Sequence, residues 1–485
     1  MTLIFRKSSA LLLSISLLFA LFSCDSTVTD DTGVPAAEST GAPQTSETQD
    51  NSQPTTETDA ETEDNTPILY YGDLPEASAN PVLSLLPRLS TREPSNTVPV
   101  GDGAVELVFD KPTESDIAAY IRTLERAGFT LAQSNTVGKN LFYTYTNSEI
   151  CVSASLTPTN NTMRIIAEPV SNYYVSEKEY TTVTTPLLTM IGREFAAATS
   201  TYLGKPANSG LMCFIIRLSD GRFILIDGGT SDNGFASYST AIYAKLRAQA
   251  PDPNNIVIAA WIITHSHGDH IGGFRSFSST YGKIVTLQSI IYDFPSQEDH
   301  DACSDETADY TGFAAALACW PETPTYKAHT GQILNIADAE IRFWFTQEDF
   351  VTRASTLASA GNKNWNNSSL AFSVDIAGER IFFLGDSQEY ANNHMANCFG
   401  SALKSDIVQM AHHGGIGGTE AIYKAIDAEI GLFTTSDELL PVYISKWAYN
   451  NTAVNKLNMK EYWNADSRIK TWNLPYHATG SGFVK

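Results

Sequence analysis

Three histidines and an aspartate lie within six residues of one another in the segment "THSHGDHIGG", residues 264–273. His265 and His267 are two apart, so their side chains point to the same side of an extended chain. Asp269 and His270 follow where the chain is expected to turn into a helix. Neutral imidazoles and carboxylates are the ligands that Zn²⁺ and similar ions prefer. Two such pairs in so short a span predict two adjacent metal ions.

The flanking residues predict the elements that position this cluster. The apolar run "NIVIAAWIIT" predicts a buried central strand over residues 256–264, which brings its following loop to a sheet edge. Upstream, "GLMCFIIRLSDGRFILIDGG" predicts a hairpin that turns at residues 219–221 and whose second strand ends at Asp227. Gly272 and Gly273 leave room for a close backbone approach. A helix is expected after the hairpin, with one face formed by Phe235, Tyr238, Ile242 and Leu246.

The cluster resembles the HxHxDH signature of the metallo-β-lactamase superfamily of metallohydrolases, and further motifs occur in the family's order. Asp227 in "FILIDGG" matches a carboxylate that supports the histidine loop. Asp386 in "RIFFLGDS" matches an acidic motif that usually bridges two metals, and "DIVQMAHHGG" matches the final histidine motif. The resemblance spans about residues 180–485. It implies an α+β fold, an αββα sandwich with helices outside and the metals at one edge.

The resemblance also implies a role for each matching residue. The first two histidines of the cluster would hold one metal, and the aspartate and the third histidine would hold the second with one member of the late doublet. Within the doublet, His412 is favoured because it comes first after the strand. Asp386 would bridge both ions, and Asp269 is the candidate catalytic residue. The predicted metal ligands are His265, His267, Asp269, His270, Asp386, His412 and His413.

The later motifs are similar to one branch of the superfamily, which contains the nuclease-like domain of bacterial competence DNA-uptake proteins. The similarity rests on "NNSSLAFSVDIAGERIFFLGDS" followed by "IVQMAHHGG". Gly415 stands where that branch has serine. Only His300 and His329 lie in the interval where the superfamily has its third histidine motif, and neither has the expected context. The branch also lacks that motif, so we expect an open or weakly held first metal site.

The predicted reaction is hydrolysis by a hydroxide that bridges two divalent ions. Zinc is the default, and manganese or iron suits the same ligands. Two cations lower the pKa of a shared water, and the hydroxide would attack phosphorus or a carbonyl. The branch resemblance favours a phosphodiester or phosphate ester, in a small-molecule or surface-attached substrate. Two alternatives stay open: a retired hydrolase domain that acts as a surface binding module, and a hydrolase of lactone, thioester or β-lactam bonds.

The start of the chain predicts export and attachment to a membrane. Arg6 and Lys7 precede an apolar core that is too short for a comfortable spanning helix. The core ends in "LFSC", which resembles the bacterial lipobox. Residues 1–24 are therefore expected to be a lipoprotein signal peptide, with lipid at Cys24 and a location on the outer side of the membrane at the cell surface. The alternative is a plain secretory peptide with an incidental cysteine.

Two further segments precede the expected sandwich. Residues 25–67 have no Lys or Arg and almost no large apolar residue, which predicts a disordered acidic linker. Residues 68–175 predict a small α/β accessory domain of β-α-β-β-β order. Its helix is expected to begin after Thr113, with Asp116 completing a capping box.

Net charge and cysteine spacing argue against three other classes of protein. The net charge of −23 is unfavourable for capturing nucleic acid, so no strong nucleic-acid binding is expected. The six cysteines have no close spacing, which argues against a disulfide framework and against a zinc ribbon. Nothing in the sequence indicates an oligomeric state.

Overall fold

The computed structural model describes residues 66–192, 200–203, 205–207, 212–232, 237–296, 299, 309–350, 365–466 and 470–484. The predicted signal peptide with Cys24, nearly all of the linker, Phe235 and His300 lie outside the described residues. Thr66–Lys485 form one compact unit. Among the helices that the structure describes, none is both long and apolar enough to cross a bilayer.

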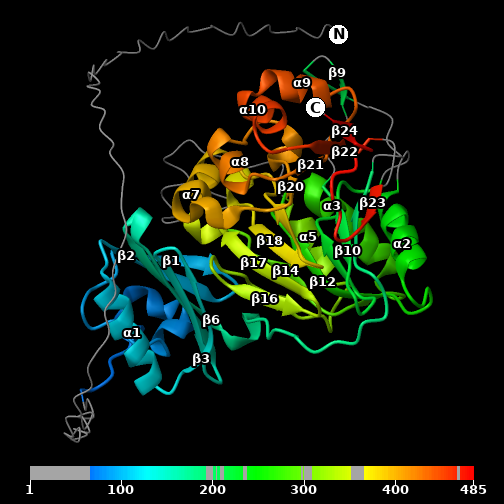
Figure 1. Cartoon of the computed structure of the whole chain (residues 1–485). Coiled ribbons are helices and arrows are strands. Elements are labelled where there is room, and N and C mark those ends of the chain that lie inside the picture. The colour runs from blue at the N-terminus through cyan, green and yellow to red at the C-terminus, as the bar shows by residue number, and fades with distance from the viewer. Residues whose placement is uncertain are drawn as a thin grey trace, which may run out of the picture. The chain divides into compact units, whose positions relative to one another are not determined.

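The first of two large sheets contains the predicted hairpin and the predicted central strand (Figure 1). β10 and β11 pair antiparallel, and β12 runs parallel to β11 and to β14. Both predictions are therefore confirmed. The outermost strand, β23, comes from the end of the chain and pairs antiparallel with β7. In spatial order the strands are β15 (Thr325–Tyr326), β14 (Ile290–Tyr292), β12 (Val257–Ile263), β11 (Phe223–Ile226), β10 (Phe214–Arg217), β7 (Leu187–Met190) and β23 (Lys470–Asn473), with β13 (Thr286–Leu287) beside β12.

The second large sheet begins with antiparallel strands and continues with parallel ones. β17, β18 and β19 form a meander, and β19 to β22 run parallel to one another. In spatial order the strands are β16 (Ile333–Ile336), β17 (Ala339–Phe345), β18 (Ala371–Ile376), β19 (Glu379–Phe383), β20 (Ile407–Gln409), β21 (Ile430–Phe433), β22 (Glu461–Asn464) and β24 (Phe483–Val484). A separate small hairpin consists of β8 (Ser200–Tyr202) and β9 (Lys205–Ala207).

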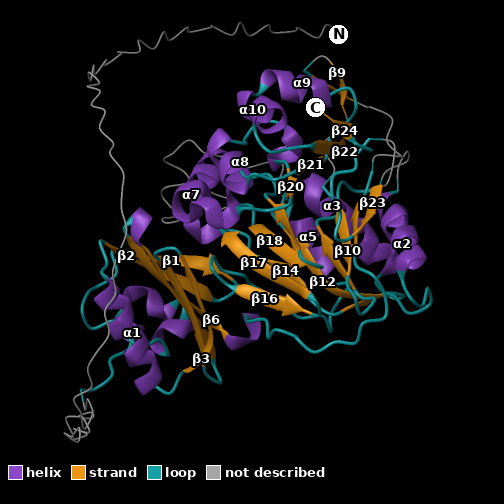
Figure 2. Ribbon diagram, viewed as in Figure 1, coloured by secondary structure: helices purple, strands orange, loops and turns teal. Residues whose placement is uncertain are grey.

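The two sheets share one apolar core and carry helices on their outer faces (Figure 2). Phe383 on β19 lies 5.3 Å from Phe214 on β10, measured between ring centroids, and so joins the two sheets. Helices α2, α3 and α5 pack on the first sheet, and α7, α8 and α10 pack on the second. The predicted αββα sandwich is therefore confirmed. The helices are α2 (Tyr238–Gln249), α3 (Gly268–Tyr281), α5 (Tyr310–Leu317), α7 (Glu389–Phe399), α8 (Glu420–Ile426), α9 (Leu440–Lys446) and α10 (Ala448–Lys456).

The front of the unit is a six-stranded antiparallel sheet. α1 (Glu114–Arg126) covers one face, and Thr113 and Asp116 form the predicted capping box. The expected β-α-β-β-β order is incomplete, because β1 contains a proline and β3 is largely polar, so neither shows the apolar alternation of a strand. The other face contributes Phe142 to the core around the second large sheet. In spatial order the strands are β1 (Asn96–Gly101), β2 (Ala104–Asp110), β6 (Thr162–Pro169), β5 (Ile150–Thr157), β4 (Asn140–Thr146) and β3 (Thr130–Val137).

Removing the ring of Phe383 tests the contact between the two large sheets. The Phe383→Ala variant leaves a cavity between two aromatic neighbours, so we expect the free energy of unfolding to fall by about 3–5 kcal/mol. Phe483→Ala is the matched control, because Phe483 is 45% exposed, and its effect should stay below about 1 kcal/mol. Urea unfolding measures both values, and equal losses would contradict the shared core.

Candidate metal centre

The carboxylate of Asp227 anchors the histidine loop. It follows β11, and the side chain is fully buried. One oxygen accepts a hydrogen bond from Thr264 N (2.7 Å), and the other accepts from Thr264 Oγ1 (2.8 Å) and from His270 Nδ1 (2.7 Å). Because the carboxylate can only accept, His270 Nδ1 carries a proton, and Nε2 is the nitrogen that faces Asp386.

The histidine loop connects β12 to α3 through a close packing of two backbones. His267 is the N-cap of α3, and Asp269 lies in its first turn. A Cβ atom added to Gly273 would lie 1.8 Å from Gly228 O, and one added to Gly272 would lie 2.3 Å from Ser231 N. The predicted close approach at these two glycines is therefore confirmed. It positions the start of α3 against the segment that carries Asp227.

Asp386 and the late histidine doublet come from the other sheet. Asp386 follows β19, and its backbone N–H donates to Ser369 Oγ (3.2 Å). His412 and His413 lie in the short helical turn η9 (Ala411–Gly414), directly after β20. His413 Nδ1 lies 2.7 Å from Thr434 Oγ1, whereas His412 Nδ1 donates to Ile416 O at 2.6 Å. These contacts turn both Nε2 atoms toward Asp386.

The two sheets bring these groups to one point. His270 Nε2 lies 3.1 Å from Asp386 Oδ1, and His413 Nε2 lies 3.3 Å from Asp386 Oδ2. His413 Nε2 is also 3.4 Å from Asp269 Oδ2. Possible ligand atoms of Asp269, His270, Asp386 and His413 all lie within 4.8 Å of one another. This group corresponds to the second metal site that the sequence predicts.

The groups for the first predicted metal adjoin this cluster. His265 Nε2 lies 3.9 Å from Asp386 Oδ2, and the His265 and His267 rings are 4.6 Å apart. His412 Nε2 lies 3.5 Å from the same carboxylate oxygen, and its side chain is 25% exposed. The structure thus brings together all of the predicted ligands. Within the doublet, His413 is the buried residue, whereas the sequence analysis favoured His412 as the metal ligand.

The donor set fits divalent cations. Four of its buried atoms make no hydrogen bond, namely His265 Nε2, His270 Nε2, His413 Nε2 and Asp386 Oδ1. Burying polar atoms without hydrogen-bond partners costs free energy. Here the four atoms face one another, and no other group in the described part of the chain satisfies them. Imidazole nitrogens and carboxylate oxygens at these separations suit zinc, manganese or iron. Their roles as metal ligands remain a prediction that the geometry favours.

The protonation of the cluster follows from burial and mutual contacts. Burial holds the pKa of His265 well below its usual value, and the neighbouring histidines lower it further. Burial also lowers the pKa of His413, but Asp386 and Asp269 outweigh it and raise the pKa to about 9. For Asp386, burial raises the pKa, and the adjacent histidines reverse the effect to well below the ordinary value. Without a cation, protons on His413 and His270 balance the carboxylates, and metal binding would displace them.

The late doublet has a strained backbone. His412 and His413 have φ of 51° and 59°, in the left-handed region that non-glycine residues rarely adopt. Such residues persist only where the surroundings impose them. Here His412 N donates to Gly385 O (3.0 Å), and Asn450 Nδ2 donates to Gly414 O (2.6 Å). The strain aims two adjacent side chains at one carboxylate.

The sequence analysis did not assign the supporting roles of three neighbouring residues. Thr264 links Asp227 to the histidine loop, Ser369 orients the Asp386 backbone, and Thr434 contacts His413. Thr434 follows β21, next to β20 in the sheet, so its position at a strand end was the available signal. His329 lies in a different buried cluster, with Glu168 and Glu348.

A family model described as the Metallo-beta-lactamase superfamily matches residues 210–426. This match supports the superfamily and the metallo-β-lactamase fold, and it includes every predicted metal ligand. No curated protein matches the chain.

Solved structures with some similarity to the chain include three of different description. YhfI from Bacillus subtilis, a metallo-β-lactamase fold protein, is 14% identical over 60% of this chain and 99% of that one, with a TM-score of 0.35. CmlA, a diiron β-hydroxylase from Streptomyces venezuelae, is 14% identical over 55% of this chain and 53% of that one, with a TM-score of 0.34. Yeast PDE1 is 11% identical over 59% of this chain and 89% of that one, with a TM-score of 0.28.

Loss of the Asp227 charge tests the support of the centre. The Asp227→Asn variant weakens the acceptor of three hydrogen bonds, so we expect metal affinity to fall about 10- to 100-fold. Competition with a chromophoric chelator measures it. Asp232→Asn is the control. Asp232 also follows β11, but it accepts hydrogen bonds from Ser237 and Ser239 at the start of α2 and not from the histidine loop. An unchanged affinity in Asp227→Asn would show that this carboxylate does not position the ligands.

Proposed function

We propose that the chain is a metal-dependent hydrolase that cleaves a phosphodiester or phosphate ester. One observation carries the proposal: the unpaired Nε2 atoms of His265, His270 and His413 converge on Asp386. The superfamily match supports hydrolysis, and the resemblance to the competence-protein branch supports a phosphoester over a β-lactam. The net charge of −23 favours a small or surface-attached ester over long nucleic acid.

Divalent ions bound at this centre would lower the pKa of a water and offset negative charge on an ester oxygen. The residues of the chain would orient the water and the substrate and accept the proton that the water loses. Asp269, whose side chain is 26% exposed, can orient the attacking water and accept its proton. His412 is partly exposed and has its Nδ1 proton tied to Ile416 O, so its Nε2 faces the space beside Asp386. It is placed to contact the substrate.

We propose further that the enzyme works at the bacterial cell surface. The lipobox-like "LFSC" supports lipid attachment at Cys24, and the acidic residues 25–67 would serve as a tether between membrane and enzyme. A substrate attached to the surface would then lie within reach of the tethered centre.

Substitution of two cluster residues tests the reaction. Asp269→Ala and His267→Ala should each lower metal-dependent hydrolysis of bis-p-nitrophenyl phosphate at least about 100-fold, because each is a predicted ligand. Metal content is measured on the same samples. His477→Ala is the histidine control, since that side chain is 82% exposed beside Glu379. Wild-type rates in Asp269→Ala or His267→Ala would refute the assignment.

A substrate panel separates the remaining alternatives. Phosphodiesters, aryl esters, a lactone, a thioester and nitrocefin are compared with the metal-loaded protein, and we expect the phosphodiesters to be cleaved fastest. Faster cleavage of any other compound would change the bond assigned. Absence of bound metal together with absence of turnover would favour a binding module.

Loss of the cysteine thiol tests the anchor. Cys24→Ala should abolish labelling of the protein by a radioactive fatty acid in growing cells, because the thiol that would carry the lipid is removed. Cys319→Ala is the control, because Cys319 is an exposed free cysteine. Unchanged labelling of Cys24→Ala would contradict lipid attachment at this residue.

A further inference from the structure

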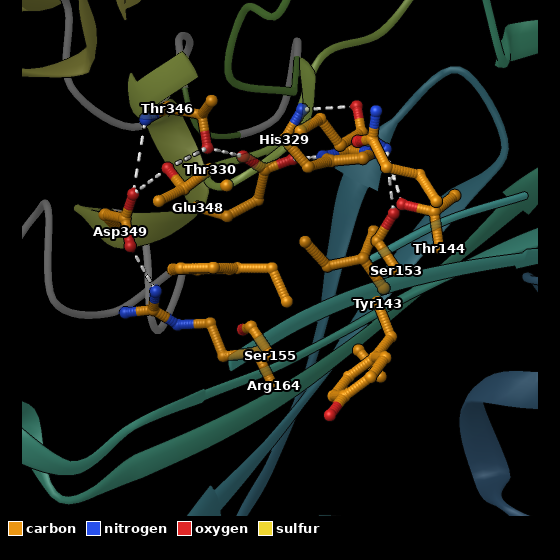
Figure 3. Close-up of a pocket in the computed structure, with 16 residues that line it drawn as sticks. Tyr143, Thr144, Ser153, Ser155, Arg164, His329, Thr330, Thr346, Glu348 and Asp349 are labelled. Atoms are coloured by element: carbon orange, nitrogen blue, oxygen red, sulfur yellow. Dashed lines mark hydrogen bonds and ion pairs between the residues drawn. The ribbon is translucent and has the colours of Figure 1, made fainter. Parts of the chain in front are cut away.

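A second group of ionisable side chains lies where the front sheet meets the sandwich. Asp293 follows β14, His329 follows β15, Glu348 lies in the short helix η6 (Gln347–Asp349), and Glu168 lies on β6. None of the four side chains is more than 2% exposed. Figure 3 shows His329 and Glu348 at one end of a cavity between the front sheet and η6. The centre described above uses none of these residues.

Three possible ligand atoms in this group face one another. His329 Nδ1 lies 2.9 Å from Glu348 Oε1 and 3.9 Å from Asp293 Oδ2. Asp293, His329 and Glu348 each offer one possible ligand atom, and these atoms lie within 4.8 Å of one another. Ligand atoms bound to one ion at about 2.0–2.2 Å are typically about 3 Å apart. The separations are therefore those of a set that could close on one cation.

Each of the three groups is fixed through its other polar atom. Asp293 Oδ1 lies 3.3 Å from Lys327 Nζ, and Thr346 Oγ1 donates to Glu348 Oε2. His329 Nε2 lies 2.9 Å from Glu168 Oε1. This is the pattern of metal sites, in which a carboxylate orients a ligating histidine and neighbours hold the ligating carboxylates. His329 Nδ1 and Glu348 Oε1 contact each other at 2.9 Å, and Asp293 Oδ2 faces this pair without a hydrogen bond of its own.

One of these atoms points independently to a missing cation. Asp293 Oδ2 is buried and receives no hydrogen bond. A buried carboxylate oxygen without a donor is costly. A cation between Asp293 Oδ2 and the His329–Glu348 pair would give this oxygen the partner that it lacks.

We propose that Asp293 Oδ2, His329 Nδ1 and Glu348 Oε1 bind a divalent cation of the zinc or manganese class. Glu168 Oε1 accepts a hydrogen bond from His329 Nε2, and the ion would displace the Nδ1 proton that lies toward Glu348. Because Glu168 belongs to the front sheet and the three ligands belong to the sandwich, the ion braces the two against each other. The site is structural and does not depend on the hydrolytic activity proposed above.

Metal content measures the additional site. Metal-free protein is dialysed against Zn²⁺ or Mn²⁺, and bound metal is determined by elemental analysis. We expect Asp293→Asn and His329→Gln each to hold about one equivalent less than the wild type. Glu106→Gln is the matched control. Glu106 is fully buried on β2 of the front sheet, but it pairs with Arg164 (3.1 Å) and is not one of the proposed ligands. It should keep the full content.

Two results would overturn the proposal. Equal metal content in wild type and Asp293→Asn would mean that the group is an ion-pair network that binds no metal. If the variants do not fold, anomalous diffraction from metal-loaded wild-type crystals decides: a peak between Asp293, His329 and Glu348 supports the site, and its absence overturns it. Phosphoester turnover is recorded in parallel, and because the histidine cluster is intact in these variants, a failure of the hydrolase assignment is separable from a failure of this site.

Discussion

The buried carboxylate of Asp227 is the constraint on which the metal centre depends. A charge with no access to water must be met by donors, and the donors available are Thr264 and His270 of the histidine loop. The loop must therefore lie against the end of β11. The same contacts decide which nitrogen of His270 faces the centre. The need to hydrogen-bond a buried carboxylate therefore also determines that Nε2 is the possible metal ligand.

The remaining geometry follows from where strands end. β11 and β12 belong to one sheet and β19 and β20 to the other, and each strand ends next to one component of the centre. The shared apolar core holds the sheets together at the level of Phe214 and Phe383. A site built on such elements is held more rigidly than one built on loops alone. The strained backbone at His412 and His413 is tolerated because neighbouring strands and Asn450 enclose it.

The hairpin and the central strand of the first sheet could be predicted because β10, β11 and β12 are almost entirely apolar, whereas the sandwich as a whole was implied by the family resemblance. The hairpin around residue 220 and the run before His265 carry turn signals and hydrophobicity that leave few alternatives. The ligand residues stood out by type and spacing, and the helix after Thr113 by its cap. β1 and β3 could not be predicted, because a proline or many polar residues hide their strand character. The choice between His412 and His413 depended on left-handed backbone angles, which sequence spacing does not reveal. The cluster around His329 was missed because its members come from four separate elements.

The pairing of β23 with β7 has a consequence for how the chain reaches its final form. Lys470–Asn473 complete a sheet whose neighbouring strand, Leu187–Met190, is made nearly three hundred residues earlier. Until Lys470–Asn473 join the sheet, β7 presents an open edge, and contacts so distant in sequence are slow to form. Such an edge can pair with other chains before folding is complete. The order of the strands along the chain thus leaves one edge of the first sheet exposed to misassembly until a segment near the C-terminus has docked.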